Sequence, residues 1–221
     1  MKTPVRFLPL ALILAATVSC TAEKTDRAAQ DEAQKKNPVE APAKDGLAHA
    51  YFASGCFWCV EAIYERVKGV KEANSGYSGG HTENPTYESS NTGKTGHAEA
   101  VEVIYDPKTV KFETLVDVYF NSHDLTQVNG QGRDIGSQYR SIIFYQNEEQ
   151  KKIIDAKIAA LNKKLAPREV AAEVLPFEKF WTAEAYHQDY EKNNPDDPYI
   201  RAVSIPRVQK CVEKMPGLLK E

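Results

Sequence analysis

Two thiols lie three residues apart in the segment 55–59, which reads Gly-Cys-Phe-Trp-Cys. A strand-like apolar run at 50–53 precedes this segment, and apolar residues at helical spacing follow it over 60–67. We therefore expect Cys56 in the first turn of a helix, where free backbone N–H groups and the helix dipole favour a thiolate. Such a thiolate is a nucleophile, and Cys59, one turn later, is placed to form a disulfide with it.

The spacing of the two cysteines has other interpretations. A zinc site needs four ligands, and the chain has no second pair of cysteines at this spacing. A haem attachment site needs a histidine directly after the second cysteine, where the chain has Val60. A buried structural pair stays open, as does a thioredoxin-type motif that exchanges disulfides with proteins. Phe57 and Trp58 are bulkier than the usual thioredoxin insert, and they suggest an apolar slot for a small group.

The composition is that of one globular domain with appendages. The chain has 221 residues, of which 42% are hydrophobic and 27% charged, so it is long enough to bury a sizeable core. The formal net charge is -3, which gives no argument for a nucleic-acid partner. No metal or bound cofactor is expected.

The N-terminus has the pattern of a targeting segment. Two basic residues precede the apolar run 7–18, which is too short to span a bilayer. Cys20 then follows in a context that looks like a bacterial lipobox, although Thr17 stands where leucine is usual. We expect residues 1–19 to be a lipoprotein-type signal peptide and Cys20 to carry the lipid; an ordinary secretory signal is the alternative. Both interpretations predict an exported bacterial protein, membrane-anchored or periplasmic.

A polar segment separates this N-terminus from the domain. Residues 20–46 are rich in Ala, Lys, Glu, Asp, Gln and Pro, a composition that cannot bury enough apolar surface to become ordered. We expect this segment to be a disordered linker that carries the lipid anchor site, and residues 47–221 to form the catalytic domain.

The domain is expected to alternate strands and helices. The strands are expected at 48–54, 70–76, 98–105, 139–145 and 170–175, and the helices at 56–68, 112–121, 148–165 and 183–192. This order predicts an α/β (α+β) fold, a two-layer sandwich in which helices pack on a ferredoxin-like mixed sheet. The tail from 195 is expected to be mostly irregular, although 206–215 could form a short helix. The long polar loop 77–96 is expected to be functional.

Glu99 is a second residue with chemical potential. Within the strand 98–105 it shares one face with Val101, Val103 and Tyr105, so it lies on the apolar side at the mouth of the long loop. A carboxyl group in a dry site has a raised pKa and stays protonated, and it can then give a proton to a developing oxyanion. The alternative is that Glu99 lies at a frayed strand end in water.

Several separated motifs together resemble one known family. They are GCFWC at 55–59, GYSGG at 76–80 with NPTY at 84–87, TGHAEAV at 95–101, QGRDIGSQYRS at 131–141 and HQDY at 187–190. In this order and at these distances they resemble the peptide methionine sulfoxide reductases of the A type, over about residues 48–199. That class repairs methionine sulfoxide.

The resemblance implies a chemistry and a role for each matching residue. Cys56 attacks the sulfoxide sulfur of a methionine S-sulfoxide, and Glu99 is the protonated donor to the departing oxygen. Tyr87 and Tyr139 match tyrosines that hydrogen-bond this oxygen, and Asp134 matches a carboxylate that supports the site through water or a neighbouring group. Phe57 and Trp58 match the walls that hold the S-methyl group.

The resemblance also implies how the enzyme is regenerated. A second thiol resolves the sulfenic acid on Cys56, and a thioredoxin-like dithiol then reduces the disulfide. Many members use a cysteine in a mobile Gly-rich tail, whereas Cys211 lies in the Gly-free segment 206–215. We therefore expect Cys59 to resolve, with Cys211 or a relay through both as alternatives.

The expected partners follow from this chemistry. They are oxidised proteins or peptides that contain methionine sulfoxide, the thioredoxin-like reductant, and a membrane reached through the N-terminal lipid; the domain itself is expected to be monomeric. Two rival functions are a membrane-tethered thioredoxin-like disulfide oxidoreductase and a non-enzymatic lipoprotein that binds apolar or methionine-rich peptides.

Overall fold

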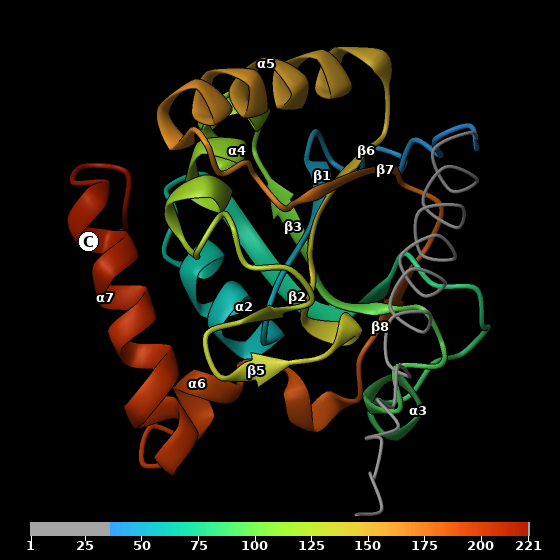
Figure 1. Ribbon diagram of the computed structural model, residues 1–221, viewed down its shortest axis with the longest axis vertical. Helices are drawn as coiled ribbons and strands as arrows, with labels where there is room; N and C mark the ends of the chain where they lie inside the picture. The colour runs from blue at the N-terminus through green and yellow to red at the C-terminus, as the bar shows by residue number, and fades with distance from the viewer. Residues whose placement is uncertain (1–35, 221) are drawn as a thin grey trace, which may run out of the picture. The chain divides into compact units, whose positions relative to one another are not determined.

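The computed structural model describes residues 36–220 (Figure 1). The expected signal peptide 1–19, the expected lipidation at Cys20 and the linker up to residue 35 lie outside the described residues. Within the described part, the strands are β1 (Ala48–Ser54), β2 (Val70–Ser78), β3 (Ala98–Tyr105), β4 (Gly130–Gln131), β5 (Asp134–Ile135), β6 (Ser141–Tyr145), β7 (Glu173–Pro176) and β8 (Phe180–Thr182).

The helices are α2 (Phe57–Glu65), α3 (Tyr87–Asn91), α4 (Phe112–Asn121), α5 (Glu148–Leu165), α6 (Tyr190–Asn193) and α7 (Ile205–Lys214). Short 3₁₀ turns lie at Ser137–Tyr139 and Ala185–His187, and a π-helical turn, Ile200–Ser204, leads directly into α7.

The main sheet has the strand order β7-β6-β1-β3-β2-β8. All neighbouring strands are antiparallel except β6 and β7, which are parallel. The four central strands, β6-β1-β3-β2, are connected by α2 after β1 and by α4 after β3. This is the ferredoxin-like arrangement expected from the sequence, with β7 and β8 added at the two edges (Figure 1).

The core lies between the sheet and helices α2 and α4. The ring of Phe52 on β1 stacks on Tyr64 of α2, with centroids 5.0 Å apart, and lies 5.7 Å from Tyr119 of α4. The hydroxyl of Tyr64 donates to the carbonyl of Leu115 at 3.0 Å, so the polar tip of this buried ring is satisfied. Fully burying each such ring contributes about 1.5–3 kcal/mol, and this packing fixes α2 over the end of β1.

Helix α5 covers α4 and β6 from outside, as Figure 1 shows at the top of the molecule. Asn147 caps it by accepting a hydrogen bond from the backbone N–H of Gln150 at 3.0 Å. Acidic residues occupy its first turn and two lysines its last turn, which complements the helix dipole at both ends. The expected bounds of this helix, 148–165, are confirmed.

The C-terminal third differs from the expectation. The predicted helix 183–192 is broken into the 3₁₀ turn and α6, because Asp189 between them has the left-handed φ of +53°. The predicted strand 170–175 pairs with β6 only over Glu173–Pro176, and the short edge strand β8 follows it. The tail is more regular than expected, because 200–214 is continuously helical and packs against α2.

Part of the expected linker is attached to the domain. The ammonium of Lys36 lies 2.9 Å from the carboxylate of Glu178, and the backbone N–H of Val39 donates to the carbonyl of Phe177 at 2.7 Å. These contacts extend the ordered domain to residue 36, ahead of the boundary at 47 predicted from composition.

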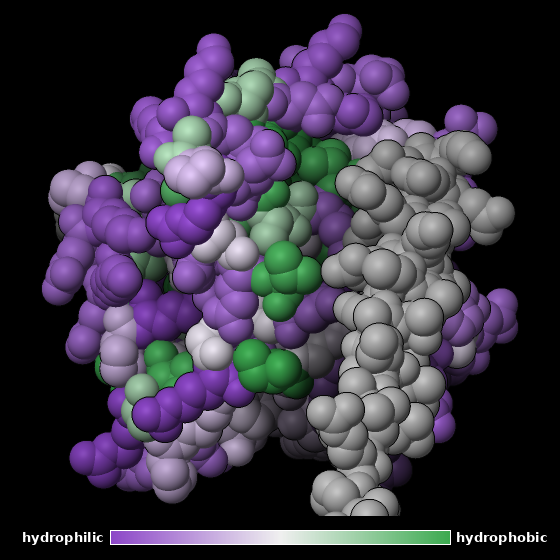
Figure 2. Space-filling model, viewed as in Figure 1, coloured by the Kyte–Doolittle hydropathy of each residue, from purple (hydrophilic) through white to green (hydrophobic). Residues whose placement is uncertain are grey.

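The surface in the view of Figure 2 is mostly hydrophilic, with apolar side chains in small separate groups. The large apolar side chains exposed among the described residues are Val39, Val128, Ile135 and Tyr186. None of the helices in the described part has the length and apolar character that crossing a membrane requires.

Candidate active site

Cys56 lies where β1 turns into α2. It caps the helix, which begins at Phe57, one residue later than predicted, and its side chain is only 6% exposed. The preceding Gly55 has a φ of +83°, and a Cβ there would lie 2.6 Å from the Cβ of Gln131. Only glycine fits this position. The turn before the nucleophile is therefore in direct contact with the Gly-rich loop 129–137.

The thiols of Cys56 and Cys59 form one hydrogen-bonded pair. Burial raises the pKa of Cys56 well above its ordinary value, and its hydrogen bond to Cys59 raises it further. The same hydrogen bond lowers the pKa of Cys59 to about 6, assisted by the charge of Arg207 and the hydroxyl of Ser204. Of the two thiols, Cys59 therefore has the lower pKa. Burial opposes the thiolate predicted at Cys56, which the helix dipole would favour.

Glu99 lies against the nucleophilic turn. It is 2% exposed, and its Oε2 accepts a hydrogen bond from the backbone N–H of Phe57 at 3.0 Å. Burial raises the pKa of Glu99 to about 8 despite this hydrogen bond. The carboxyl is therefore mostly protonated at pH 7, as predicted from its place on the apolar face of its strand. The residues that share this face, Val101, Val103 and Tyr105, are all buried.

Two tyrosines stand around the same point. Tyr87 is the first residue of α3, and Tyr139 ends the 3₁₀ turn before β6. Burial raises the pKa of both phenols, and the charges of Glu99 and Cys56 act on each of them. Both hydroxyl groups are therefore neutral donors close to the nucleophile and the acid.

Asp134 is connected to the thiol pair through Tyr199. The hydroxyl of Tyr199 donates to Oδ2 of Asp134 at 2.6 Å. The hydroxyl oxygen of Tyr199 also lies 4.0 Å from the sulfur of Cys59. The neighbouring group through which Asp134 reaches the site is therefore a tyrosine in the tail.

Aromatic rings form a wall beside the nucleophile. The ring centroids of Phe57 and Trp58 are 6.2 Å apart. The indole of Trp58 stacks on Tyr190 with centroids 3.7 Å apart and planes 8° from parallel, and Tyr199 meets it edge-on at 5.9 Å. Phe57 is buried, whereas Trp58 is half-buried. Phe57 is therefore the inner ring of the wall, and Trp58 is the outer ring, which reaches the surface.

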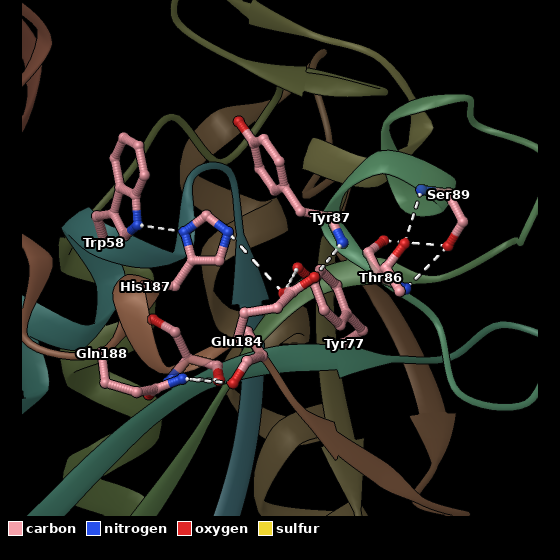
Figure 3. A network of polar contacts seen from close by, with 10 residues as sticks. Trp58, Tyr77, Thr86, Tyr87, Ser89, Glu184, His187 and Gln188 are labelled. Carbon is pink, nitrogen blue, oxygen red and sulfur yellow. Dashed lines mark hydrogen bonds and ion pairs between the residues drawn. The ribbon is translucent and has the colours of Figure 1, made fainter.

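A polar network lies behind this wall (Figure 3). The indole N–H of Trp58 donates to Nδ1 of His187 at 3.1 Å, and Nε2 of the same imidazole lies 4.0 Å from Oε2 of Glu184. The carboxylate of Glu184 also accepts from the backbone N–H of Tyr87 at 2.9 Å and from the hydroxyl of Tyr77 at 3.0 Å. Three residues, His187, Tyr87 and Tyr77, therefore surround one carboxylate.

Cys211 lies in α7 and is 2% exposed. Burial raises the pKa of its thiol, and the charges of Arg207 and Lys214 on its own helix lower it. It acts electrostatically on Tyr64, which lies two turns beyond Cys56 along α2. The structure therefore brings Cys59, rather than Cys211, into hydrogen-bonding contact with the nucleophile.

The structure brings most of the predicted residues to one place: Cys56, Cys59, Phe57, Trp58, Tyr87, Glu99, Asp134 and Tyr139. Cys211 lies beside this group, on the α7 side of α2.

Residues that sequence reasoning missed are Tyr199, Glu184 and Arg207. Glu184 and Tyr199 lie within the range 48–199 of the resemblance, Glu184 only three residues before the HQDY motif, whereas Arg207 lies beyond it. No spacing rule pointed to any of the three. No group of three or more His, Cys, Asp or Glu side chains within residues 36–220 is arranged to hold a metal ion.

Comparisons with known proteins give a consistent similarity. The family model described as peptide methionine sulfoxide reductase matches residues 48–217. A peptide methionine sulfoxide reductase MsrA of Pasteurella multocida is 47% identical over 171 residues, which cover 77% of this chain and 98% of the relative. The MsrA of Saccharolobus solfataricus is 45% identical over 171 residues, covering 77% and 96%.

Solved structures agree with the sequence relatives. Methionine sulfoxide reductase A of Corynebacterium diphtheriae is 32% identical, with a TM-score of 0.61, over 74% of this chain and 84% of that chain. Mxr1 from Saccharomyces cerevisiae in reduced form is 32% identical, with a TM-score of 0.59, over 73% and 92%.

Proposed function

This chain belongs to the peptide methionine sulfoxide reductase A family and is a thiol-dependent peptide-methionine (S)-S-oxide reductase, and from that premise we propose how its residues divide the reaction. The observation that carries the proposal is a buried acid held against the turn that carries the nucleophile. The protonated carboxyl of Glu99 accepts from the N–H of Phe57, the residue next to Cys56.

The first step is the attack of Cys56 on the sulfoxide sulfur. Cys56 donates its proton to the thiolate of Cys59 as its own sulfur bonds to the substrate sulfur. The hydrogen bond within the pair and the lowered pKa of Cys59 support this division of roles. Cys56 thus becomes a strong nucleophile only in contact with substrate, which leaves the resting thiol less open to oxidation.

The oxygen of the substrate is protonated as its bond to sulfur weakens. Glu99 gives the proton, while Tyr87 and Tyr139 donate hydrogen bonds to the same oxygen. Removing one such donor typically costs about 10²–10³-fold in rate. The burial of Glu99 and its effect on the pKa of both phenols support this arrangement.

The oxygen atom ends on Cys56 as a sulfenic acid, and methionine leaves. Cys59 then attacks the sulfenic sulfur, a disulfide forms between the two cysteines, and the hydroxyl group leaves as water with the proton from Cys59. Glu99 recovers its proton from solvent. The substrate gains two electrons and the two thiols lose two, so an external dithiol must supply two electrons for each turnover.

Phe57 and Trp58 hold the S-methyl group of the substrate, and Asp134 orients Tyr199 beside the thiol pair. The aromatic contacts around Trp58 and the short hydrogen bond from Tyr199 to Asp134 support these roles. The substrates are oxidised proteins or peptides with an accessible methionine sulfoxide, and the electron donor is a thioredoxin-like dithiol.

The rival interpretation as a thioredoxin-like disulfide oxidoreductase is not favoured. The relatives that match 77% of the chain carry the name of the reductase.

We propose further that the enzyme is exported and tethered by lipid at Cys20. The basic start, the apolar run 7–18 and the lipobox-like context of Cys20 support this. In a bacterial host, wild-type protein should label with an alkynyl fatty acid and sediment with membranes, and Cys20→Ala should do neither. Equal labelling of the two proteins contradicts the proposal.

The reaction is tested by its stoichiometry. Wild type, Cys59→Ser and Cys211→Ser are each mixed with methionine S-sulfoxide, first without reductant and then with thioredoxin, and methionine is measured by chromatography. We expect Cys59→Ser to form one methionine per enzyme and then stop in both cases, and to form it more slowly than wild type because it lacks the thiolate that accepts the proton of Cys56. We expect Cys211→Ser to turn over with thioredoxin. Turnover by Cys59→Ser and arrest of Cys211→Ser would assign the resolving role to Cys211.

A further inference from the structure

The mechanism makes no use of His187, although its imidazole lies at the centre of the aromatic wall. The side chain is 1% exposed and ends the 3₁₀ turn Ala185–His187. Its ring centroid lies 4.9 Å from that of Phe57 and 4.6 Å from that of Tyr87. A buried imidazole that packs against two residues assigned to substrate binding can directly affect where those residues lie.

The hydrogen bond from Trp58 determines which nitrogen of His187 carries the proton. An indole N–H can only donate, so Nδ1 of His187 must be the unprotonated acceptor. Burial lowers the pKa of His187 below its ordinary value, so the ring is neutral and its single proton is on Nε2. That N–H has no hydrogen-bond partner within the described residues and lies 4.0 Å from the carboxylate of Glu184.

Glu184 is held in place from its other side. Its two oxygens accept hydrogen bonds from the backbone N–H of Tyr87 and from the hydroxyl of Tyr77. Tyr77 is paired directly opposite Glu99 where β2 and β3 run side by side. Although burial opposes it, these hydrogen bonds and the nearby His187 keep the pKa of Glu184 below its ordinary value. The imidazole therefore faces a fixed negative charge, which favours the tautomer that accepts from Trp58.

The segment that carries both residues is fastened to the sheet. The side chain of Gln188 accepts from the backbone N–H of Ser75 at 2.9 Å and donates to the carbonyl of Ser75 at 3.0 Å. The backbone N–H of Ala183 also donates to the carbonyl of Ser75 at 2.9 Å. The turn between them is thus anchored at both ends to the edge of β2, and Figure 3 shows Gln188 lying along this strand.

We propose that Glu184 and His187 form a positioning dyad that sets the orientation of the Trp58 indole and thereby the size of the slot for the substrate's S-methyl group. Stacking on Tyr190 constrains the plane of the indole. The hydrogen bond from Nε1 to His187 constrains the position of the indole within that plane. The dyad moves no proton during the reaction.

The inference rests on the proposed role of Phe57 and Trp58 as the walls of the methyl slot. It predicts selectivity against a larger alkyl group on sulfur. A site that excludes one additional methylene group typically discriminates by about 10- to 200-fold. Loss of one hydrogen bond that holds the wall should reduce this ratio by about 2- to 10-fold.

The first test compares kcat/KM for two peptides, one with methionine S-sulfoxide and one with ethionine S-sulfoxide. His187→Phe keeps an aromatic ring but has no acceptor for Trp58, whereas His187→Asn has an oxygen near the place of Nδ1 and is the matched control. We expect His187→Phe to lose selectivity, mostly through a higher KM for the methionine peptide, and His187→Asn to keep it within about twofold.

A double-mutant cycle separates this role from a general structural one. Trp58→Phe has no N–H to donate, so adding His187→Phe to it should change the selectivity no further. This comparison also serves if His187→Phe alone folds poorly, since Trp58→Phe should then reproduce the loss of selectivity by itself. Unchanged selectivity in both single variants would overturn the inference.

A second measurement does not depend on catalysis. The chain has two tryptophans, so Trp181→Phe leaves Trp58 as the single tryptophan, which can be excited selectively over the tyrosines. In this background His187→Phe should lower the fluorescence anisotropy of Trp58, and His187→Asn should not. Equal anisotropy in all three proteins overturns the dyad. If anisotropy falls as expected but wild type shows no methyl selectivity, the assignment of Phe57 and Trp58 as walls is wrong and the dyad itself stands.

Discussion

The rate of the chemical step should depend on the proton carried by Glu99. Burial raises the pKa of this carboxyl to about 8 from the ordinary 4.5. At pH 7 a carboxyl with the raised pKa is roughly 90% protonated, whereas an ordinary one is about 0.3% protonated. Burial thus increases the proton-bearing fraction by about 300-fold, which sets an upper bound on its kinetic benefit at neutral pH.

The direction of the pH dependence follows from this pKa. The acid form of Glu99 is active, so the rate should fall as pH rises through about 8 and then drop tenfold for each further pH unit. It should also fall as pH drops through about 6, because Cys59 then no longer accepts the proton of Cys56. Glu99→Gln has no proton to transfer, although its amide can donate a hydrogen bond. We expect it to lose about 10²–10⁴-fold in rate and to lack the alkaline fall.

The assay must isolate this step from reduction of the disulfide. Single-turnover formation of methionine in rapid-quench experiments without reductant meets this requirement. Glu102→Gln, the same change on the opposite face of β3, is the matched control and should keep the wild-type pH profile. The reasoning fails if Glu99→Gln loses less than about tenfold in rate, or if its profile keeps a fall with a midpoint near pH 8.

Three further changes test other parts of the structure. Arg207→Met removes the cation that helps to lower the pKa of Cys59, so ultraviolet titration of the thiolate should show that pKa moving up from about 6. Gly55→Ala forces a Cβ to within 2.6 Å of Gln131 at a φ of +83°, and calorimetry should show a loss of at least about 1–2 kcal/mol in unfolding free energy together with loss of activity. Burial raises the pKa of Glu61 to about 7, which favours folding at low pH and is lost as pH rises through 7. Glu61→Gln should therefore gain up to about 3 kcal/mol relative to wild type between pH 4.5 and 8 in denaturant titrations, and an unchanged difference would contradict this.

The central fold was predictable because its signals are local. Burial alternates along β3 from Val101 to Tyr105, and the expected bounds of β1, β3, α4 and α5 agree with those observed. The helix α3 inside the predicted loop 77–96 was missed because it is only five residues long, although Thr86 and Ser89 form a capping box that marks its start.

The parts that were not predictable depend on contacts distant in sequence. The break at Asp189 is held by Glu61, whose carboxylate accepts from the backbone N–H of Asp189 at 3.2 Å across 128 residues. The pKa of Cys59 is lowered in part by Arg207, which lies in α7; the sequence suggested a short helix over 206–215 but not that it packs beside the thiols. The local sequence pattern predicts the helix dipole that favours a thiolate at Cys56. It does not predict how deeply Cys56 is buried, and burial raises the pKa of this thiol.

The closed packing of the thiols has a consequence for how electrons enter. A folded dithiol donor carries its attacking sulfur on its own surface and must approach along the axis of the disulfide it reduces. In the described part of the chain Cys56, Cys59 and Cys211 are all buried, so no such approach exists in this conformation. Ser204, which contacts Cys59, belongs to a π-helical turn, a rare geometry that is frequent at functional sites, and this turn is the segment that would have to move to expose Cys59. Small thiols and protein donors should therefore reduce the disulfide at different rates. The rate with a protein donor should depend on how often this turn opens.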